Sequence, residues 1–193
     1  MFTGLVEETG IVTEVKEAGE GKRVTVEADW AATDVSIGDS ISVSGACLTV
    51  EGFDEESLSF FLAEETLDRT WFSELEEGDE LNFERSLTPR DRMGGHYVQG
   101  HVDSVSEIGE IEELEEGWNF TFSIPEKISQ YIVEKGFVTV EGISLTVTEV
   151  SEDYFSVTII PETWEATNLS EKEEGDHVNI EADIMAKYVE KMA

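Results

Sequence analysis

Two nucleophilic side chains occupy matching places along the sequence. Cys47 lies in the stretch GACLTV (45–50), and Ser144 lies in the similar stretch GISLTV (142–147). A thiol or a hydroxyl adds to an electrophilic carbon when a neighbouring base removes its proton. A lone cysteine is as often a small core residue, and a serine can simply satisfy a turn. Because the two positions match, we expect both side chains to line a polar site.

Histidine is the side chain that most often moves protons near neutral pH. Two of the three histidines, His96 and His101, follow the glycine pair at 94–95. A histidine at this place can instead be a linker residue that only forms hydrogen bonds. The spacing of His96 and His101 from Cys47 matches no common zinc ligand set, so we expect no metal site. Lys135, one of 12 basic residues, is a candidate for contact with a ligand or for a local salt bridge.

An internal repeat must position these side chains. Residues 45–84 match residues 142–181 without a gap, 97 positions later, and the stretch EEGD occurs at both 76–79 and 173–176. Self-similarity at a fixed offset indicates a duplicated structural unit, and the glycine pair at 94–95 is a natural boundary. We therefore predict an N-terminal domain over 1–94, a C-terminal domain over 95–182 and a separate tail over 183–193.

Each repeat consists mostly of short stretches that are typical of β-strands. Apolar and β-branched residues alternate with polar ones or form short runs, separated by Gly, Asp and Asn. Closure hides the edges of short strands, so we predict a β-barrel in each half rather than an open sandwich. Short helical segments are expected at 64–67, at its copy, and over 126–133 after a proline. The clearest strands are expected at 23–27, 40–43, 58–62, 137–140 and 154–160.

The tail from Asp183 to Ala193 has a different pattern. Its apolar residues recur with helical spacing, and Asp183 is placed to cap the first turn. An amphipathic helix outside two closed barrels must bury its apolar face against those barrels or against another subunit. We predict that this helix drives oligomerisation through Ile184, Met185, Tyr188, Val189 and Met192.

The overall charge argues against several classes of partner. The chain has 12 Lys and Arg against 45 Asp and Glu, which gives a formal net charge of −33. Nucleic-acid backbones and anionic membranes attract clustered Lys and Arg, so we expect neither partner. Self-repulsion at this charge is relieved by a high concentration of cations, and we therefore expect a halophilic source. We also expect a cytoplasmic protein, because the chain has one cysteine, no leader-like N-terminus and no long apolar run.

Five stretches in order carry a wider pattern. They are MFTGLVE (1–7), GACLTV (45–50), GGHYVQGHVD (94–103), the segment from KG to GISLTV (135–147) and IPET (160–163). Together with the duplication and the terminal helix, they resemble riboflavin synthase of the α-subunit type. The resemblance covers essentially the whole chain.

This resemblance implies an all-β fold of two six-stranded Greek-key β-barrels with a C-terminal α-helix, assembled as a homotrimer through these helices. It implies a dismutation, the last step of riboflavin biosynthesis. One 6,7-dimethyl-8-ribityllumazine passes four carbons to another, which gives riboflavin and 5-amino-6-(ribitylamino)uracil. The family uses no metal or organic cofactor, and its half-sites come from the N-terminal barrel of one subunit and the C-terminal barrel of its neighbour. Association with lumazine synthase is a further implied partnership, and a lumazine-binding protein without catalysis is the alternative.

The resemblance also assigns residues to the chemistry, which needs loss of a proton from the C7 methyl group of one lumazine and nucleophilic addition at C7 of the other. It implies proton transfer by His101 and addition or orientation by Cys47 and Ser144, with water as the alternative nucleophile. The implied catalytic residues are His101, Ser144, Cys47, Thr146 and Ser40, with Phe2 and Thr3 near the reacting rings. The N-terminal half-site is expected to include Gly4, Leu5, Val6, Cys47, Leu48, Thr49, Phe61, Leu62, Ala63, Glu64, Glu65 and Thr66. The C-terminal half-site is expected to include Gly100, His101, Val102, Lys135, Ser144, Leu145, Thr146, Thr158, Ile159, Ile160, Pro161, Glu162 and Thr163.

Overall fold

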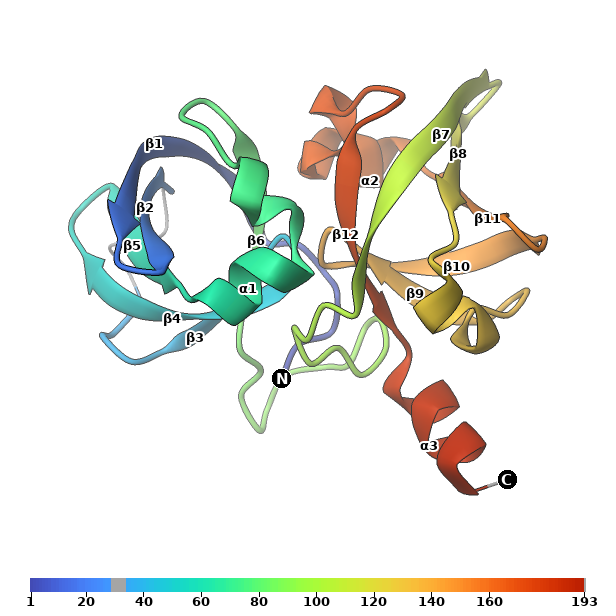
Figure 1. Ribbon diagram of the computed structural model, residues 1–193, viewed down its shortest axis with the longest axis horizontal. Helices are drawn as coiled ribbons and strands as arrows, with labels where there is room; N and C mark the ends of the chain where they lie inside the picture. The colour runs from blue at the N-terminus through green and yellow to red at the C-terminus, as the bar shows by residue number, and fades with distance from the viewer. Residues whose placement is uncertain (29–33, 193) are drawn as a thin grey trace.

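The structure is a computed structural model that describes residues 1–28 and 34–192. Over these residues the chain forms two closed six-stranded antiparallel barrels and a C-terminal helix, α3 (Ile184–Met192). Figure 1 shows the barrels side by side, with the N-terminus between them and α3 beyond them. The predicted all-β duplication with a terminal helix is confirmed.

The first barrel is a Greek key. Its strands are β1 (Glu8–Ala18), β2 (Gly21–Glu27), β3 (Ser40–Val43), β4 (Ala46–Phe53), β5 (Ser57–Leu62) and β6 (Glu80–Arg85). Their order around the barrel is β1-β2-β5-β4-β3-β6, and pairing of β6 with β1 closes it. Strands β3, β4 and β5 form consecutive hairpins while β6 returns beside β3, which is the Greek-key arrangement.

The second barrel repeats the first, strand for strand. Its strands are β7 (Ser104–Leu114), β8 (Gly117–Ser123), β9 (Phe137–Val140), β10 (Ile143–Val150), β11 (Tyr154–Ile159) and β12 (His177–Ala182). Their order around the barrel is β10-β11-β8-β7-β12-β9. Read from β7 in the opposite direction, this closed ring is β7-β8-β11-β10-β9-β12, which is the order of the first barrel with each number raised by six. The short helical segments are α1 (Glu64–Arg69), η2 (Trp71–Glu74), η3 (Glu126–Tyr131), α2 (Pro161–Ala166) and η4 (Asn168–Glu171). The five strands expected from the sequence therefore form where predicted, and the helical segment expected over 126–133 is a 3₁₀ helix that ends at Tyr131.

Each barrel has its own apolar core because alternate residues of every strand point inward. Phe60 and Phe83 stack in the first core, with ring centroids 6.4 Å apart. Phe122 stacks on Phe155 in the second core, with centroids 5.2 Å apart. The residues between these positions face outward, so functional side chains on the strands lie on the outer surface of a rigid barrel.

A buried polar network joins the two barrels. Glu141 is fully buried, and its carboxylate accepts hydrogen bonds from Trp71 Nε1 at 2.8 Å and from the backbone nitrogen of Asn179 at 2.6 Å. Asn168 Nδ2 donates to the same carboxylate at 3.0 Å, and Asn82 Nδ2 donates to the Glu141 carbonyl oxygen at 2.9 Å. Because each of these groups would be costly to leave unpaired, the network fixes one relative orientation of the barrels.

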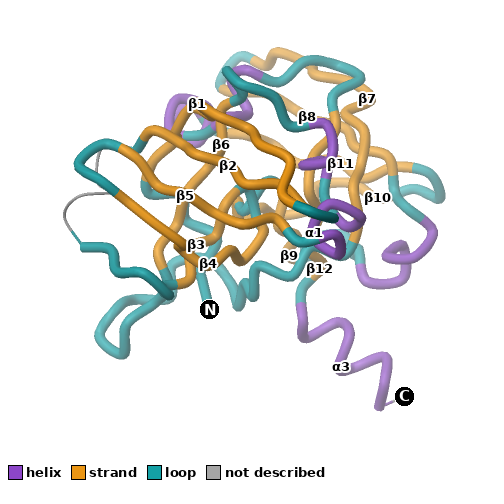
Figure 2. Tube along the Cα trace, turned by 60° about the vertical axis from the view of Figure 1, so that its left-hand side comes forward, coloured by secondary structure: helices purple, strands orange, loops and turns teal. Residues whose placement is uncertain are grey.

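Helix α3 extends beyond the barrels in Figures 1 and 2, and it is tied to the second half by Lys187, which pairs with Asp103, and by Glu190, which accepts a hydrogen bond from Tyr131. The predicted cap is confirmed, because the Asp183 carboxylate accepts a hydrogen bond from the backbone nitrogen of Met185 at 2.9 Å. The side chains of Met185, Tyr188, Val189 and Met192 are between 56% and 78% exposed, so the apolar face is uncovered in the single chain. Among the described residues, no helix has the length and apolarity that a membrane crossing requires.

Candidate active site

The two barrels exchange short segments next to the nucleophilic residues. Residues 2–6 precede the first barrel but lie against the second, and residues 98–102 precede the second barrel but lie against the first. They cross at a reciprocal backbone bridge, in which the Phe2 nitrogen donates to the Val98 oxygen at 2.8 Å and the Val98 nitrogen donates to the Phe2 oxygen at 3.2 Å. After the crossing, the Gly4 oxygen accepts from the backbone nitrogen of Ser144 at 2.8 Å.

The matching contact in the other half joins the Gly100 oxygen to the backbone nitrogen of Cys47, also at 2.8 Å. We expected residues 4–6 beside Cys47 and residues 100–102 beside Ser144, and this assignment is wrong. The two segments resemble each other, and each leads directly into the first strand of its own barrel. Matching the repeats therefore shows that the segments are equivalent but not that they are exchanged.

Glycine is required where each exchanged segment passes its nucleophilic residue. Gly4 and Gly100 have φ of +77° and +78°, in the left-handed region that glycine adopts without strain. A Cβ atom on Gly4 would lie 2.6 Å from the Ser144 Cβ, and one on Gly100 would lie 2.6 Å from the Cys47 Cβ. The two half-sites thus share one backbone construction.

The Cys47 half-site is a cavity of about 290 Å³ on the outer surface of the first barrel. Strand β4 supplies Cys47, α1 forms one wall, and the exchanged segment brings His101 to the same cavity. His101 is exposed, whereas Cys47 is half-buried. The cavity is lined by Ala46, Cys47, Leu48, Glu65, Thr66, Arg69, Thr70, Gly100, His101 and Val102. A thiol and an imidazole both border this cavity, and these groups can serve as a nucleophile and as a proton carrier.

The Ser144 half-site has a different histidine. His96 Nδ1 lies 2.7 Å from the Ser144 Oγ, and its Nε2 lies 3.2 Å from the Thr139 Oγ1. The imidazole is only 6% exposed and stacks on Phe137 with centroids 5.1 Å apart. Burial lowers the pKa of His96 below its usual 6.5, so the ring is neutral at pH 7. A neutral imidazole bound to a serine hydroxyl can orient that hydroxyl or take its proton.

The neutral state of His96 makes the stability of the fold depend on pH. The unfolded chain takes up this proton near pH 6.5, whereas the folded chain resists it until a lower pH. The contribution of His96 to the free energy of unfolding is therefore fully present above about pH 6.5. It is lost as the pH falls through the lowered pKa of His96 in the folded chain. We expect the melting temperature of the unmodified chain to fall more steeply from pH 7 to pH 5 than that of a His96→Asn variant. Parallel pH profiles in calorimetry would contradict this assignment.

Both repeats and the full chain match known proteins. Residues 3–86 and 99–183 each match the lumazine binding domain. Riboflavin synthase from Actinobacillus pleuropneumoniae is 41% identical over 99% of this chain and 89% of its own length. Riboflavin synthase from Bacillus subtilis is 39% identical over 98% of this chain and 88% of its own length. Riboflavin synthase from Schizosaccharomyces pombe is 41% identical over 100% of this chain and 93% of its own length.

The chain belongs to the riboflavin synthase family. Because this similarity extends over nearly the whole chain, it is an enzyme of the riboflavin synthase type. Among solved structures, LumP complexed with riboflavin is similar with a TM-score of 0.89 and 24% identity, over 94% of this chain and 99% of that one. LumP complexed with 6,7-dimethyl-8-(1'-D-ribityl) lumazine gives a TM-score of 0.86 over the same shares. At this identity the two structures support the fold alone.

Several residues that the resemblance assigns to the site do not border the Cys47 cavity in the single chain. Phe2 is fully buried at the crossing and Thr3 is 3% exposed, so both side chains hold the exchanged segment. Ser40 borders a separate cavity of about 500 Å³ together with Thr3 and Leu5, next to the exchanged segment of the Ser144 half. The structure thus brings Cys47 and His101 together but leaves Ser40 outside their cavity.

The strand residues that we predicted for the site alternate between the core and the surface. Leu48 and Leu145 point into the barrel cores and are 5% and 7% exposed, whereas Thr49 and Thr146 point outward and are exposed. The remaining predicted residues lie at the ends of β5 and β11 and on α1 and α2. Of these, Leu62 and Ile159 are core residues, and Phe61, Ala63, Glu64, Thr158, Ile160, Pro161 and Glu162 are exposed, with Thr163 half-buried.

Lys135 adopts an unusual backbone conformation. Its φ is +63°, and its backbone nitrogen donates to the Val147 oxygen. The equivalent position in the first repeat is Gly38, whose φ is +96° and whose nitrogen donates to the Val50 oxygen. Lys135 therefore occupies a left-handed backbone position at which the other repeat has glycine.

Proposed function

We propose that the chain catalyses the dismutation of two molecules of 6,7-dimethyl-8-ribityllumazine into riboflavin and 5-amino-6-(ribitylamino)uracil. One lumazine donates a four-carbon unit and the other accepts it. The proposal rests on the riboflavin synthase relatives, and the pair of half-sites supports it.

The observation that carries the proposal is a pair of half-sites with one backbone plan and unequal chemistry. The exchanged segments, the glycines and the strand positions of Cys47 and Ser144 correspond between the repeats. The histidines do not correspond, since His101 matches Leu5 in the other segment. A reaction between two identical heterocycles needs similar pockets for binding, but it needs different groups for the donor and the acceptor.

We assign proton transfer at the C7 methyl group to His101. Either Cys47 or Ser144 adds to C7 of the other lumazine, or one of them orients the water that adds. Holding both rings in register replaces a bimolecular encounter with an oriented one, which can supply several kcal/mol of the barrier. No step of this scheme needs a metal or an organic cofactor.

The complete site forms between subunits of a homotrimer, with the N-terminal barrel of one chain facing the C-terminal barrel of the next. Helix α3 supports this arrangement because it extends beyond the barrels (Figure 2) and leaves its apolar face uncovered in the single chain. Association with lumazine synthase, a cytoplasmic location and a halophilic source remain parts of the proposal.

A Val189→Asp substitution is expected to dissociate the trimer and to lower turnover, because it places a charge in the apolar contact between helices. Light scattering measures the mass, and removal of residues 184–193 should have the same effect. Leu114→Asp at the tip of the β7–β8 hairpin is the matched control, since this side chain is also exposed. If the Val189→Asp variant keeps the same mass as the Leu114→Asp variant, α3 does not hold the assembly together.

The competing function is storage of a lumazine or flavin without turnover, as in a binding protein of the same fold. The relatives named riboflavin synthase favour the enzyme, as does the presence of Cys47, His101, Lys135 and Ser144 together. The experiment is to incubate the purified chain with the lumazine in molar KCl and to follow riboflavin by absorbance. Formation of riboflavin is expected, and tight binding without product would support storage.

A further inference from the structure

Two buried carboxylates hold the exchanged segments, and neither belongs to the residues assigned to the reaction. We propose that Glu181 is a positioning residue for the Cys47 half-site and that Glu84 has the same role for the Ser144 half-site. The proposal rests on the proposed function where it concerns turnover, but its local part stands on the geometry of the segments.

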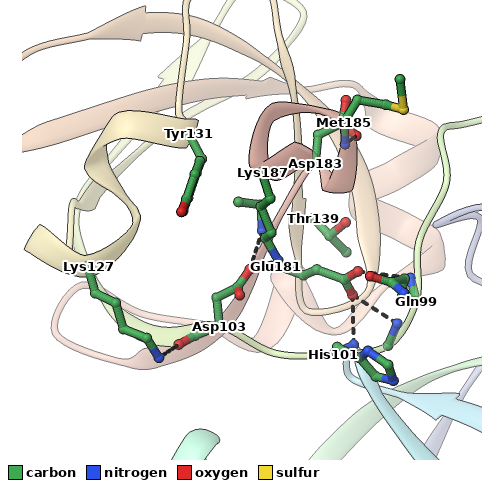
Figure 3. A network of polar contacts seen from close by, with 12 residues as sticks. Gln99, His101, Asp103, Lys127, Tyr131, Thr139, Glu181, Asp183, Met185 and Lys187 are labelled. Atoms are coloured by element: carbon green, nitrogen blue, oxygen red, sulfur yellow. Dashed lines mark hydrogen bonds and ion pairs between the residues drawn. The ribbon is translucent and has the colours of Figure 1, made fainter. Parts of the chain in front are cut away.

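Glu181 is the penultimate residue of strand β12 and accepts hydrogen bonds from three consecutive backbone nitrogens. Its Oε1 accepts from Gln99 at 2.8 Å, and its Oε2 accepts from Gly100 at 2.9 Å and from His101 at 3.0 Å. Figure 3 shows this carboxylate directed at the segment that carries His101. The side chain of Glu181 is 2% exposed, so water does not substitute for these contacts.

Glu84 is the penultimate residue of the equivalent strand, β6, and it binds the other segment through two backbone nitrogens and one hydroxyl. Its Oε1 accepts from the Thr3 nitrogen at 2.7 Å and from the Thr3 Oγ1 at 2.8 Å, while its Oε2 accepts from the Gly4 nitrogen at 2.9 Å. This side chain is 5% exposed. The same device therefore occurs once in each half.

A single glycine links each carboxylate to a nucleophilic residue through backbone hydrogen bonds. The Gly100 nitrogen is bound by Glu181, and the Gly100 oxygen accepts from the Cys47 nitrogen. Gly4 links Glu84 to Ser144 in the same way. Each carboxylate thus belongs to one barrel and fixes a segment against a nucleophilic residue of the other barrel.

Burial of a charged carboxylate costs desolvation free energy, even when the carboxylate pairs with backbone nitrogens. Burial raises the pKa of Glu84 and Glu181, because desolvation disfavours their charged forms, while the backbone donors act in the opposite direction. A neutral side chain of the same length has one oxygen and cannot accept all three hydrogen bonds. The two oxygens of a carboxylate are required to bind three donors that point at one place.

A second anchor ends each exchanged segment. Asp103 binds Lys187 of α3 at 2.6 Å and accepts from the Ala182 nitrogen at 2.9 Å, as Figure 3 shows for the ion pair. Glu7, at the equivalent position, binds Arg85 at 2.8 Å. Each segment is therefore held at its middle by a buried carboxylate and at its end by an ion pair, which leaves His101 on a short restrained loop.

The test compares Glu181→Gln with Glu84→Gln and uses Cys47, the only cysteine of the chain, as a local probe. In Glu181→Gln one backbone donor loses its acceptor, and we expect kcat to fall about tenfold or more while lumazine binding changes less. We also expect the rate of Cys47 alkylation by iodoacetamide to change in Glu181→Gln and to stay the same in Glu84→Gln. Glu84→Gln should lower kcat through the Ser144 half alone.

Glu141→Gln is the control for a purely structural effect. This carboxylate is also fully buried with three donors, but it joins the barrels and contacts neither segment. Its substitution should lower the melting temperature and leave the alkylation rate of Cys47 unchanged. The proposal is overturned if all three variants change that rate alike, or if Glu181→Gln changes neither the rate nor kcat. If the unmodified chain makes no riboflavin, the alkylation comparison still decides the positioning role, and only the proposed function fails.

Discussion

Replacement of His101 by glutamine is expected to lower riboflavin formation by about 100-fold or more, since general acid–base catalysis typically contributes that much. Glutamine keeps a similar length and hydrogen-bonding capacity but does not exchange a proton near neutral pH. The backbone nitrogen of His101 remains bound to Glu181, so the exchanged segment should stay in place. Steady-state kinetics should therefore show a loss in kcat with a small change in KM.

His177→Gln is the matched control for the His101 variant. His177 is also exposed and is paired with Glu74 at 3.1 Å, but it begins strand β12 and does not border the Cys47 cavity. This variant should turn over lumazine at the rate of the unmodified chain. Equal kcat values for the two histidine variants would remove His101 from the proton-transfer step.

Substitution of Gly100 by alanine is expected to abolish measurable turnover. The new Cβ would lie 2.6 Å from the Cys47 Cβ and 2.8 Å from the Cys47 nitrogen, and both are held by strand β4. The residue would also be strained, because its φ is +78°. Relief of the clash must move the segment away from Cys47, which breaks the Gly100–Cys47 hydrogen bond and displaces His101.

Gly19→Ala separates the clash from the backbone strain. Gly19 has a φ of +71°, and a Cβ there would meet no atom within 4 Å. Its substitution should cost about 1–2 kcal/mol of unfolding free energy and leave kcat unchanged. Denaturant unfolding should show a larger loss for Gly100→Ala, because overpacking typically adds about 1–3 kcal/mol. An active Gly100→Ala chain would mean that the exchanged segment does not have to meet Cys47.

The parts of the fold that depend on local pattern could be predicted from the sequence. The period-two stretches indicated the strands, the repeat indicated two equivalent barrels, and the helical spacing after Asp183 indicated α3. The unusual turn at Lys135 also had a signal, because the repeat aligns it with Gly38. These features are set by residues close together in the chain, or by positions that match at a fixed offset.

The exchange of segments had no such signal, because residues 2–6 fit either barrel equally well as a sequence. The pairing of His96 with Ser144 was missed for a related reason. Nothing in the first repeat corresponds to His96, so the comparison of the repeats could not assign it a partner. The Glu84–Glu181 pair was visible as a match, yet it is two residues among 45 acidic ones, and most of the acidic residues that the structure describes are exposed. Their burial follows only from the closed barrels.

We expect two molecules of one substrate to react with each other on this chain. The direct measurement is the mass balance of the reaction, with 6,7-dimethyl-8-ribityllumazine as the only substrate and with every product quantified by chromatography. Two lumazine molecules should disappear for each riboflavin and each 5-amino-6-(ribitylamino)uracil that form. Lumazine that binds and is recovered unchanged would contradict it.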